Sequence, residues 1–94
     1  MGVDINGKGF LVGSTVSVTG TVNLVLNQLA RVKLPSGAHV YTNSPKTSVS
    51  AYAVGSTPTL SGTVIGFTNG GLSCTIQEAD GNLISALNST VVAT

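Results

Sequence analysis

Two closely similar segments lie 42 residues apart in this chain, and this repetition constrains its fold more than any other feature. Residues 12–22 read VGSTVSVTGTV and residues 54–64 read VGSTPTLSGTV, with seven of eleven positions identical. Self-similarity at such a period is typical of domains built from repeated supersecondary units. The sequence therefore predicts two duplicated units of about 42 residues.

The match continues beyond these segments and defines the predicted organisation of the chain. At the same offset Val32 pairs with Cys74 and Leu34 with Ile76. A two-residue insertion then aligns Ser36-Gly37 with Asp80-Gly81, and Val40 with Ile84. We predict a single domain over residues 1–94, with an N-terminal arm (1–11), a first repeat (12–42), a second repeat (54–86) and a C-terminal tail (88–94).

The repetition also decides between a helix and a hairpin for residues 22–33. Read alone, VNLVLNQLARVK fits an amphipathic helix tolerably. Its counterpart, residues 64–75, contains Asn69-Gly70-Gly71, and each glycine costs a helix about 1 kcal/mol relative to alanine. Asn-Gly between apolar residues is instead a strong hairpin signal. Both segments are therefore predicted to be hairpins.

Period-two alternation predicts which strand residues face the core. Val, Ile and Thr make up nearly a third of the chain, which favours strands over helices. Gly20 and Gly62 occupy matching mid-strand positions, where glycine marks a bend or a close backbone approach. We predict an all-β fold, a small barrel or compact sandwich. Its expected core face comprises Val16, Val18, Gly20, Val22, Leu24, Leu26, Ala30, Val32, Leu34, Ala38, Val40, Leu60, Gly62, Val64, Leu72, Cys74, Ile76, Leu83 and Ile84.

The opposite face differs between the two halves. In the first half it carries only polar residues, whereas in the second it continues into Ile65 and Phe67. Exposed apolar side chains commonly mark interaction sites, so these two residues are a candidate interface. The alternative is a bulge at Gly66 that turns Phe67 into the core, and the sequence leaves both possibilities open.

The charge content is unusually low, at 7% of residues against roughly 25% in ordinary soluble proteins. Serine and threonine instead occupy 23 of the 94 positions. Burying a neutral hydroxyl costs far less than burying an unpaired charge, so such a surface dehydrates easily at an interface. A single cysteine also leaves this small domain without an internal disulfide. We interpret the composition as a signal of assembly; the alternative is a monomer with a neutral polar coat.

Few side chains are available for chemistry: Asp4, His39, Cys74, Glu78 and Asp80. Cys74 is predicted to be an inert core thiol, and His39 a surface residue near a turn or a titrating group at a subunit contact. The spacing of Glu78, Asp80 and Asn82 suits either a calcium site or a hairpin turn, and the turn is favoured because Ca²⁺ prefers six to eight oxygens. We expect no enzymatic activity, cofactor or metal.

Net charge and hydropathy narrow the possible partners. The net charge is +1 and the nearest basic pair is Arg31 and Lys33, so we expect no nucleic-acid partner. The N-terminus MGVDINGKGF lacks the features of a signal peptide, and no apolar stretch approaches transmembrane length. We therefore expect synthesis in the cytoplasm without secretion, and no membrane association.

This neutral, hydroxyl-rich and glycine-rich strand pattern resembles the small structural proteins of bacteriophage virions, most closely capsid decoration or cement proteins. The resemblance implies a homo-oligomer, which we take to be a trimer, bound to the major capsid protein or another virion protein. Residues 1–11 and 88–94 are candidate arms that add a strand to a neighbour. The candidate interface residues are Val3, Ile5, Phe10, Ile65, Phe67, Val91 and Val92.

Two other functions fit the same sequence. One is a ligand-binding or carbohydrate-binding β-module, which predicts an exposed aromatic platform at Tyr41 or Tyr52. The other is a component of a phage tail or fibre.

Removal of residues 1–9 is expected to leave the fold intact and to abolish capsid binding if the decoration hypothesis is right.

Overall fold

The computed structural model of the chain describes residues 11–26, 29–43 and 52–94, and its fold is all-β, as the sequence predicts. Two short 3₁₀ turns, η2 (Asn69–Gly71) and η3 (Asn88–Thr90), follow the fifth and seventh strands. The described strands are β1 (Thr15–Thr19), β2 (Thr21–Leu26), β3 (Leu29–Lys33), β4 (His39–Asn43), β5 (Thr59–Thr68), β6 (Ser73–Gln77), β7 (Leu83–Leu87) and β8 (Val92–Ala93).

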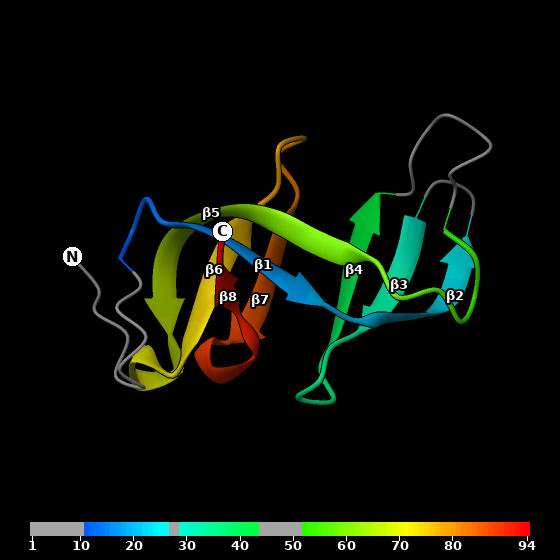
Figure 1. Cartoon of the computed structure of the whole chain (residues 1–94), viewed down its shortest axis with the longest axis horizontal. Helices are drawn as coiled ribbons and strands as arrows, with labels where there is room; N and C mark the ends of the chain where they lie inside the picture. Colours follow the sequence, from blue (N-terminus) through cyan, green and yellow to red (C-terminus); the bar gives the residue numbers. More distant parts are fainter. Residues whose placement is uncertain (1–10, 27–28, 44–51) are drawn as a thin grey trace.

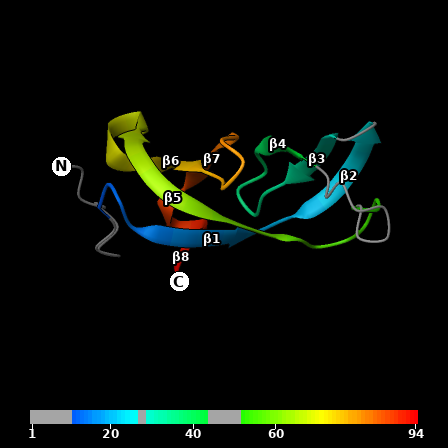
Figure 2. The same cartoon turned by 90° about the horizontal axis from the view of Figure 1, so that it is seen from above.

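The strands form two antiparallel sheets, one in the order β7-β6-β5-β1-β8 and the other in the order β2-β3-β4. β1 and β5 pair through Thr15–Thr19 and Thr59–Thr63 in the middle of the molecule, with β6 and β7 at one end and β3 and β4 at the other (Figure 1). Figure 2 shows both groups rising from the same side of the β1–β5 ladder. Within the described residues the strand pairing leaves two open sheets, so a closed barrel is not confirmed.

Backbone contacts recur at the 42-residue offset. The Gly13 N–H donates to the Val64 carbonyl at 2.8 Å, and the Gly55 N–H donates to the Val22 carbonyl at the same distance. The Val64 N–H donates in turn to the Ser14 carbonyl, and the Val22 N–H donates to the Ser56 carbonyl, both at 2.9 Å. A duplication would produce such recurrence, although the duplication itself remains a prediction.

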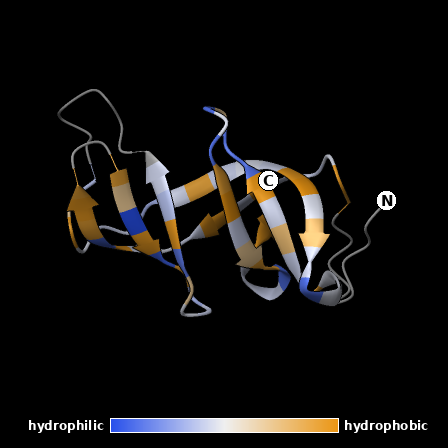
Figure 3. Ribbon diagram, turned by 180° about the vertical axis from the view of Figure 1, so that it is seen from behind, coloured by the Kyte–Doolittle hydropathy of each residue, from blue (hydrophilic) through white to orange (hydrophobic). Residues whose placement is uncertain are grey.

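The core lies between the β1–β5 ladder and the two flanking groups of strands. Orange and pale residues alternate along most strands in Figure 3, because one face of each strand is buried and the other is not. Most of the predicted core positions are buried as expected. The buried apolar residues are Val16, Val18, Val22, Ala30, Val32, Leu34, Val40, Leu60, Val64, Cys74, Ile76, Ile84, Ala86 and Val91.

The first hairpin contains a bulge that changes the expected faces. The register of β2 against β3 shifts between Val22 and Leu24, so Asn23 is an extra residue on β2. One extra residue moves every later side chain to the opposite face. The prediction that Leu24 and Leu26 point into the core is therefore wrong: Leu26 is exposed, and Val25 packs against the core instead.

The second hairpin has the same irregularity. The register of β5 against β6 shifts between Val64 and Gly66, and Phe67 packs against the core. Of the two possibilities for Phe67, the inward one is thus confirmed.

Three further residues that were predicted to be buried are exposed: Ala38, Leu72 and Leu83. Leu72 lies beside the η2 turn, and Leu83 precedes Ile84, which occupies the inward position of β7.

The hairpin turns also correct the predicted alignment of the halves. Val22 faces Val32 and Val64 faces Ile76, so Val32 corresponds to Ile76 rather than to Cys74. The reason is that the second hairpin has two more residues between its strands than the first. The turns at Ser36-Gly37 and Asp80-Gly81 are confirmed, and both glycines have a φ of 92°. Asn43-Ser44-Pro45, the predicted turn between halves, lies largely outside the described residues.

Gly20 and Gly62 permit the close approach of neighbouring strands. A Cβ atom on Gly20 would collide with the Val32 side chain and lie 2.8 Å from the Lys33 carbonyl oxygen. A Cβ atom on Gly62 would collide with the Gln77 carbonyl oxygen and lie 2.7 Å from its carbon. Both glycines thus allow a long strand segment to bend tightly against the next hairpin.

Candidate functional site

The outer face of the β1–β5 ladder is lined by hydroxyl groups. Because Val16, Val18 and Leu60 point into the core, the residues that alternate with them point outward. In the ladder Thr15 faces Thr63, Ser17 faces Ser61 and Thr19 faces Thr59, and Thr21 and Thr57 extend the array. We call this surface the hydroxyl face: Thr15, Ser17, Thr19, Thr21, Thr57, Thr59, Ser61 and Thr63.

The hydroxyl face is neutral and partly satisfies its own hydrogen bonds. The Thr19 and Thr59 hydroxyl oxygens lie 3.0 Å apart in a cross-strand hydrogen bond. None of its eight members is ionisable under ordinary conditions, so covering the face with another protein requires no removal of charge from water.

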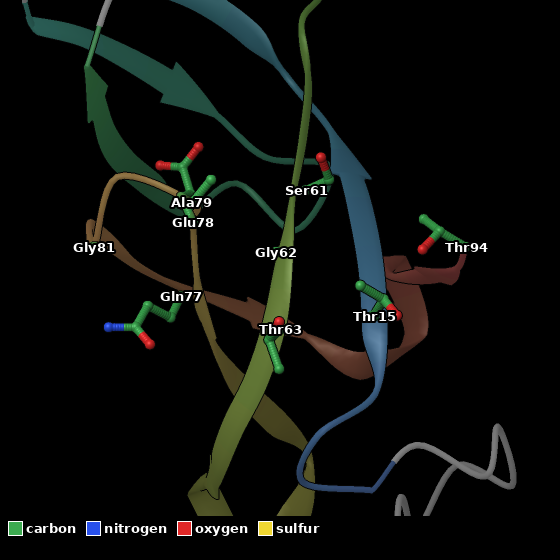
Figure 4. Close-up of a pocket in the computed structure, with 9 residues that line it drawn as sticks. All are labelled: Thr15, Ser61, Gly62, Thr63, Gln77, Glu78, Ala79, Gly81 and Thr94. Carbon is green, nitrogen blue, oxygen red and sulfur yellow. The ribbon is translucent and has the colours of Figure 1, made fainter.

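A shallow hollow lies at each end of the hydroxyl face. One, of about 660 Å³, is bordered by β1, β5, β6, the turn that follows β6 and the C-terminal residue Thr94 (Figure 4). The other, of about 320 Å³, lies beside Gly20, Lys33 and Pro35. Their linings correspond in large part: Ser61, Gly62 and Thr63 border the first, and Thr19, Gly20 and Thr21 border the second.

Glu78 forms a polar clamp between the two halves of the chain. Its Oε1 accepts hydrogen bonds from the Thr42 hydroxyl and from Asn82 Nδ2, each at 2.7 Å. Asn82 Nδ2 also donates to the Tyr41 carbonyl at 2.8 Å, and the Asn82 N–H donates to Asp80 Oδ1 at 3.0 Å. These oxygens therefore stabilise the turn and attach it to β4. No group of three metal-ligating side chains comes together in the described part of the chain.

The two tyrosines predicted as possible platforms differ in environment. Tyr52 is half-buried against the core, and burial raises its pKa above the usual 10.0, with Glu78 and Asp80 adding to the effect. Tyr41 is 48% exposed on the outer side of β4. Only Tyr41 has the exposure that a binding platform requires.

A second polar surface covers the outer side of the β2-β3-β4 sheet. Arg31 Nε donates to Asn23 Oδ1 at 2.8 Å, and Asn23 Nδ2 donates to His39 Nε2 at 3.1 Å. In the strand register Arg31 faces Tyr41 and Lys33 faces His39. We call Asn23, Arg31, Lys33, His39 and Tyr41 the basic face. In the sequence Arg31 and Lys33 are recognisable only as the nearest basic pair, because only the strand register reveals their neighbours.

The predicted interface residues that the structure describes, Ile65, Phe67, Val91 and Val92, differ in exposure. Ile65 is exposed at 44%, whereas Phe67 contacts the core and Val91 is completely buried. Val92 has an exposed side chain, but its strand is paired with β1. Val3, Ile5 and Phe10 lie outside the described residues. Cys74 is buried as predicted.

The C-terminal tail is not a free arm, contrary to our prediction. Residues 92–93 form strand β8 beside β1, and the Thr94 N–H donates to the Thr15 carbonyl at 3.1 Å. Asn88 is buried, and its Nδ2 donates to the Gly71 carbonyl at 2.8 Å. The tail therefore occupies an edge of its own sheet, because Val91 and Asn88 anchor it to the interior.

Comparisons with protein-family models, curated proteins and solved structures gave no match for this chain. The described residues contain no helix that is both long enough and apolar enough to cross a membrane.

Proposed function

We propose that the protein is a non-enzymatic structural protein that attaches to other protein subunits in a large assembly, as capsid decoration or cement proteins do. The hydroxyl face is the observation that supports this proposal most directly. It is a continuous array of eight neutral side chains over the central ladder, and its cross-strand register keeps the hydroxyls in place. Such a face can be covered at low desolvation cost.

Self-association is part of the proposal. The hydroxyl face favours a twofold dimer over the trimer that we expected from the sequence, because a twofold dimer brings the same patch of both subunits together and requires a self-complementary surface. The hydroxyl face meets this requirement, because hydroxyl groups both donate and accept hydrogen bonds. Its repeated Thr and Ser pairs also present the same chemistry from either end of the ladder.

Light scattering after size-exclusion chromatography tests the role of the hydroxyl face. The wild-type protein is expected to be a stable oligomer, and Ser61→Glu is expected to convert it to a monomer by placing a charge at the centre of the face. Ser36→Glu adds the same charge on an exposed turn and should leave the oligomer unchanged. A wild-type monomer over the accessible concentration range would contradict self-association.

The place of assembly requires a separate test. The composition and strand pattern resemble bacteriophage virion proteins, so we expect the chain in purified particles analysed by mass spectrometry. Labelling within the particle then distinguishes a capsid location from the alternative of a tail or fibre component. If the chain were absent from purified particles of a phage that encodes it, the virion proposal would be refuted.

The second candidate function is carbohydrate recognition, and the exposure of Tyr41 favours it. A tyrosine ring on an open sheet, beside the amide and guanidinium of Asn23 and Arg31, suits stacking on a sugar. Screening the protein against a panel of glycans, with Tyr41→Ala as the comparison, tests this candidate. Binding by a monomer that is lost in Tyr41→Ala would favour recognition over assembly.

A further inference from the structure

The two halves of the chain share a core pattern but have different outer faces. The strand registers assign each basic-face residue a counterpart in the second half: the two bulge residues are Asn23 and Ile65, and the two central strands align β3 with β6. The counterparts of Asn23, Arg31, Lys33, His39 and Tyr41 are Ile65, Thr75, Gln77, Leu83 and Ser85. Every ionisable or aromatic member is thus neutral and non-aromatic in the other half.

This difference is not required by the fold. The inward residues of the same strands remain apolar in both halves, for example Val32 and Ile76, which are both completely buried. The second half forms the same bulged hairpin and third strand without any charge on its outer face. The fold of a half therefore does not itself require the charges of the basic face.

The bulge at Asn23 positions the charged groups. As the extra residue of β2, Asn23 reaches both Arg31 and His39 with its amide. Bulges are frequent where a side chain has to be re-aimed. The hydrogen bond from Arg31 Nε fixes the guanidinium plane and leaves the terminal nitrogens at its other end for a further acceptor. The result is a linked set of three side chains, Arg31, Asn23 and His39, with Lys33 and Tyr41 as their neighbours in the strand register.

Neither Arg31 nor Lys33 forms an ion pair with a carboxylate among the residues that the structure describes. Glu78 is engaged by Thr42 and Asn82 at the clamp. We propose that the basic face binds carboxylate groups on the surface of a partner protein. This inference deepens the proposed function by naming the chemistry of the partner surface, with Arg31 as the bidentate donor and Lys33 as the neighbouring point charge.

A protein partner fits this face better than a nucleic acid does. Affinity for nucleic acids comes largely from cationic side chains that neutralise several phosphates, whereas the basic face has only two such side chains, Arg31 and Lys33. Its single aromatic ring, that of Tyr41, provides no platform for successive bases. Two cations and a fixed amide instead match a small cluster of acidic side chains.

Fluorescence anisotropy with a labelled deca-glutamate peptide tests the inference on the full-length protein. At about 20 mM salt, where surface charges are weakly screened, we expect measurable binding by the wild type. Arg31→Gln/Lys33→Gln should weaken binding by about tenfold or more, because it removes both of the cationic groups that donate to the carboxylates of the peptide. Lys33→Gln alone, at an exposed position, should show a smaller loss of the same sign.

The matched control is Lys8→Gln/Lys46→Gln, which removes the same net charge elsewhere in the sequence. It should bind the peptide within about twofold of the wild type if the face, rather than bulk charge, is responsible. Asn23→Asp should weaken binding, because it gives Arg31 a carboxylate within the chain, and Asn23→Ala should weaken it less. Circular dichroism checks that each variant is folded.

Equal losses in the two double variants would overturn the inference, and so would tighter binding of labelled oligothymidylate or polygalacturonate than of the peptide. Because binding is measured on the isolated chain, this outcome is independent of the oligomer test on Ser61. A failed oligomer test would refute self-association and leave the carboxylate-binding face in place.

Discussion

Val18 and Leu60 face each other directly in the β1–β5 ladder, although they occupy the same position in two segments 42 residues apart. When equivalent positions of two segments face each other in an antiparallel ladder, the residue before each position faces the residue after the other. The contacts on one side of this central pair are therefore repeated on the other side. Thus Ser17 faces Ser61 where Thr19 faces Thr59, and the bends at Gly20 and Gly62 lie on opposite sides of the crossing. The hydroxyl face is a direct consequence of this arrangement.

Alanine at Gly62 is expected to lower the free energy of unfolding by about 1 to 3 kcal/mol, the usual cost of overpacking. The added Cβ would collide with the backbone of Gln77, which cannot rotate away. Gly20→Ala should behave similarly, because the Lys33 carbonyl is equally fixed. Urea denaturation measures both effects.

Gly66→Ala is the control for the glycine substitutions. A Cβ at Gly66 would meet no atom within 4 Å, and its φ is not positive. Its stability should therefore change little or rise by about 0.4 to 1 kcal/mol. Equal losses at Gly62 and Gly66 would show that the close approach to Gln77 is not the reason for glycine.

Thr42→Val is expected to destabilise the protein by about 1.5 to 3 kcal/mol, the range for hydrogen bonds to charged groups. The variant keeps the shape of the buried side chain but removes the 2.7 Å hydrogen bond to Glu78. Thr19→Val, which removes an exposed hydroxyl bond, should cost less than about 0.5 kcal/mol. A double-mutant cycle with Glu78→Gln should give a clear coupling energy, and additive effects would contradict the clamp.

Tyr52 is expected to titrate above the usual tyrosine pKa of 10.0, because burial and the nearby carboxylates of Glu78 and Asp80 disfavour its phenolate. Ultraviolet absorbance of Tyr41→Phe, in which Tyr52 is the only tyrosine, measures this pKa. Glu78→Gln in the same background should lower it. A midpoint at or below 10.0 would contradict the described environment.

The raised pKa of Tyr52 also predicts a loss of stability at alkaline pH. Above pH 10.0 the unfolded chain releases the phenolic proton while the folded chain still holds it, so the free energy of unfolding falls as pH rises through this window. Tyr52→Phe should be less sensitive to pH in that range. Denaturation curves at several alkaline pH values measure the difference.

The adjacent valines of the tail provide a test of its packing. Val91 is completely buried and Val92 is 61% exposed. Val91→Ala should destabilise the protein by about 2 kcal/mol through loss of buried surface and a small cavity. Val92→Ala should change stability by less than about 0.5 kcal/mol. If both substitutions were neutral, the tail would behave as the free arm that the sequence suggested.

The sequence by itself determined the local structure of this protein. Alternation of Val and Thr specified the strands, and the Ser36-Gly37 and Asp80-Gly81 pairs specified turns that need a positive φ. Comparison of the two segments identified residues 22–33 as a hairpin. These features depend on neighbours within a few residues, so they are visible in the linear pattern.

Tertiary structure alone decided which side chains meet. The bulge at Asn23 reversed the expected face of Leu26, and the bulge at Ile65 selected the inward of the two possible positions of Phe67, because register depends on pairing with a distant strand. The same pairing assembled the basic face from β2, β3 and β4, and most of the hydroxyl face from β1 and β5. Burial of Val91 likewise drew the tail into the sheet, since only the folded core offers it an apolar site.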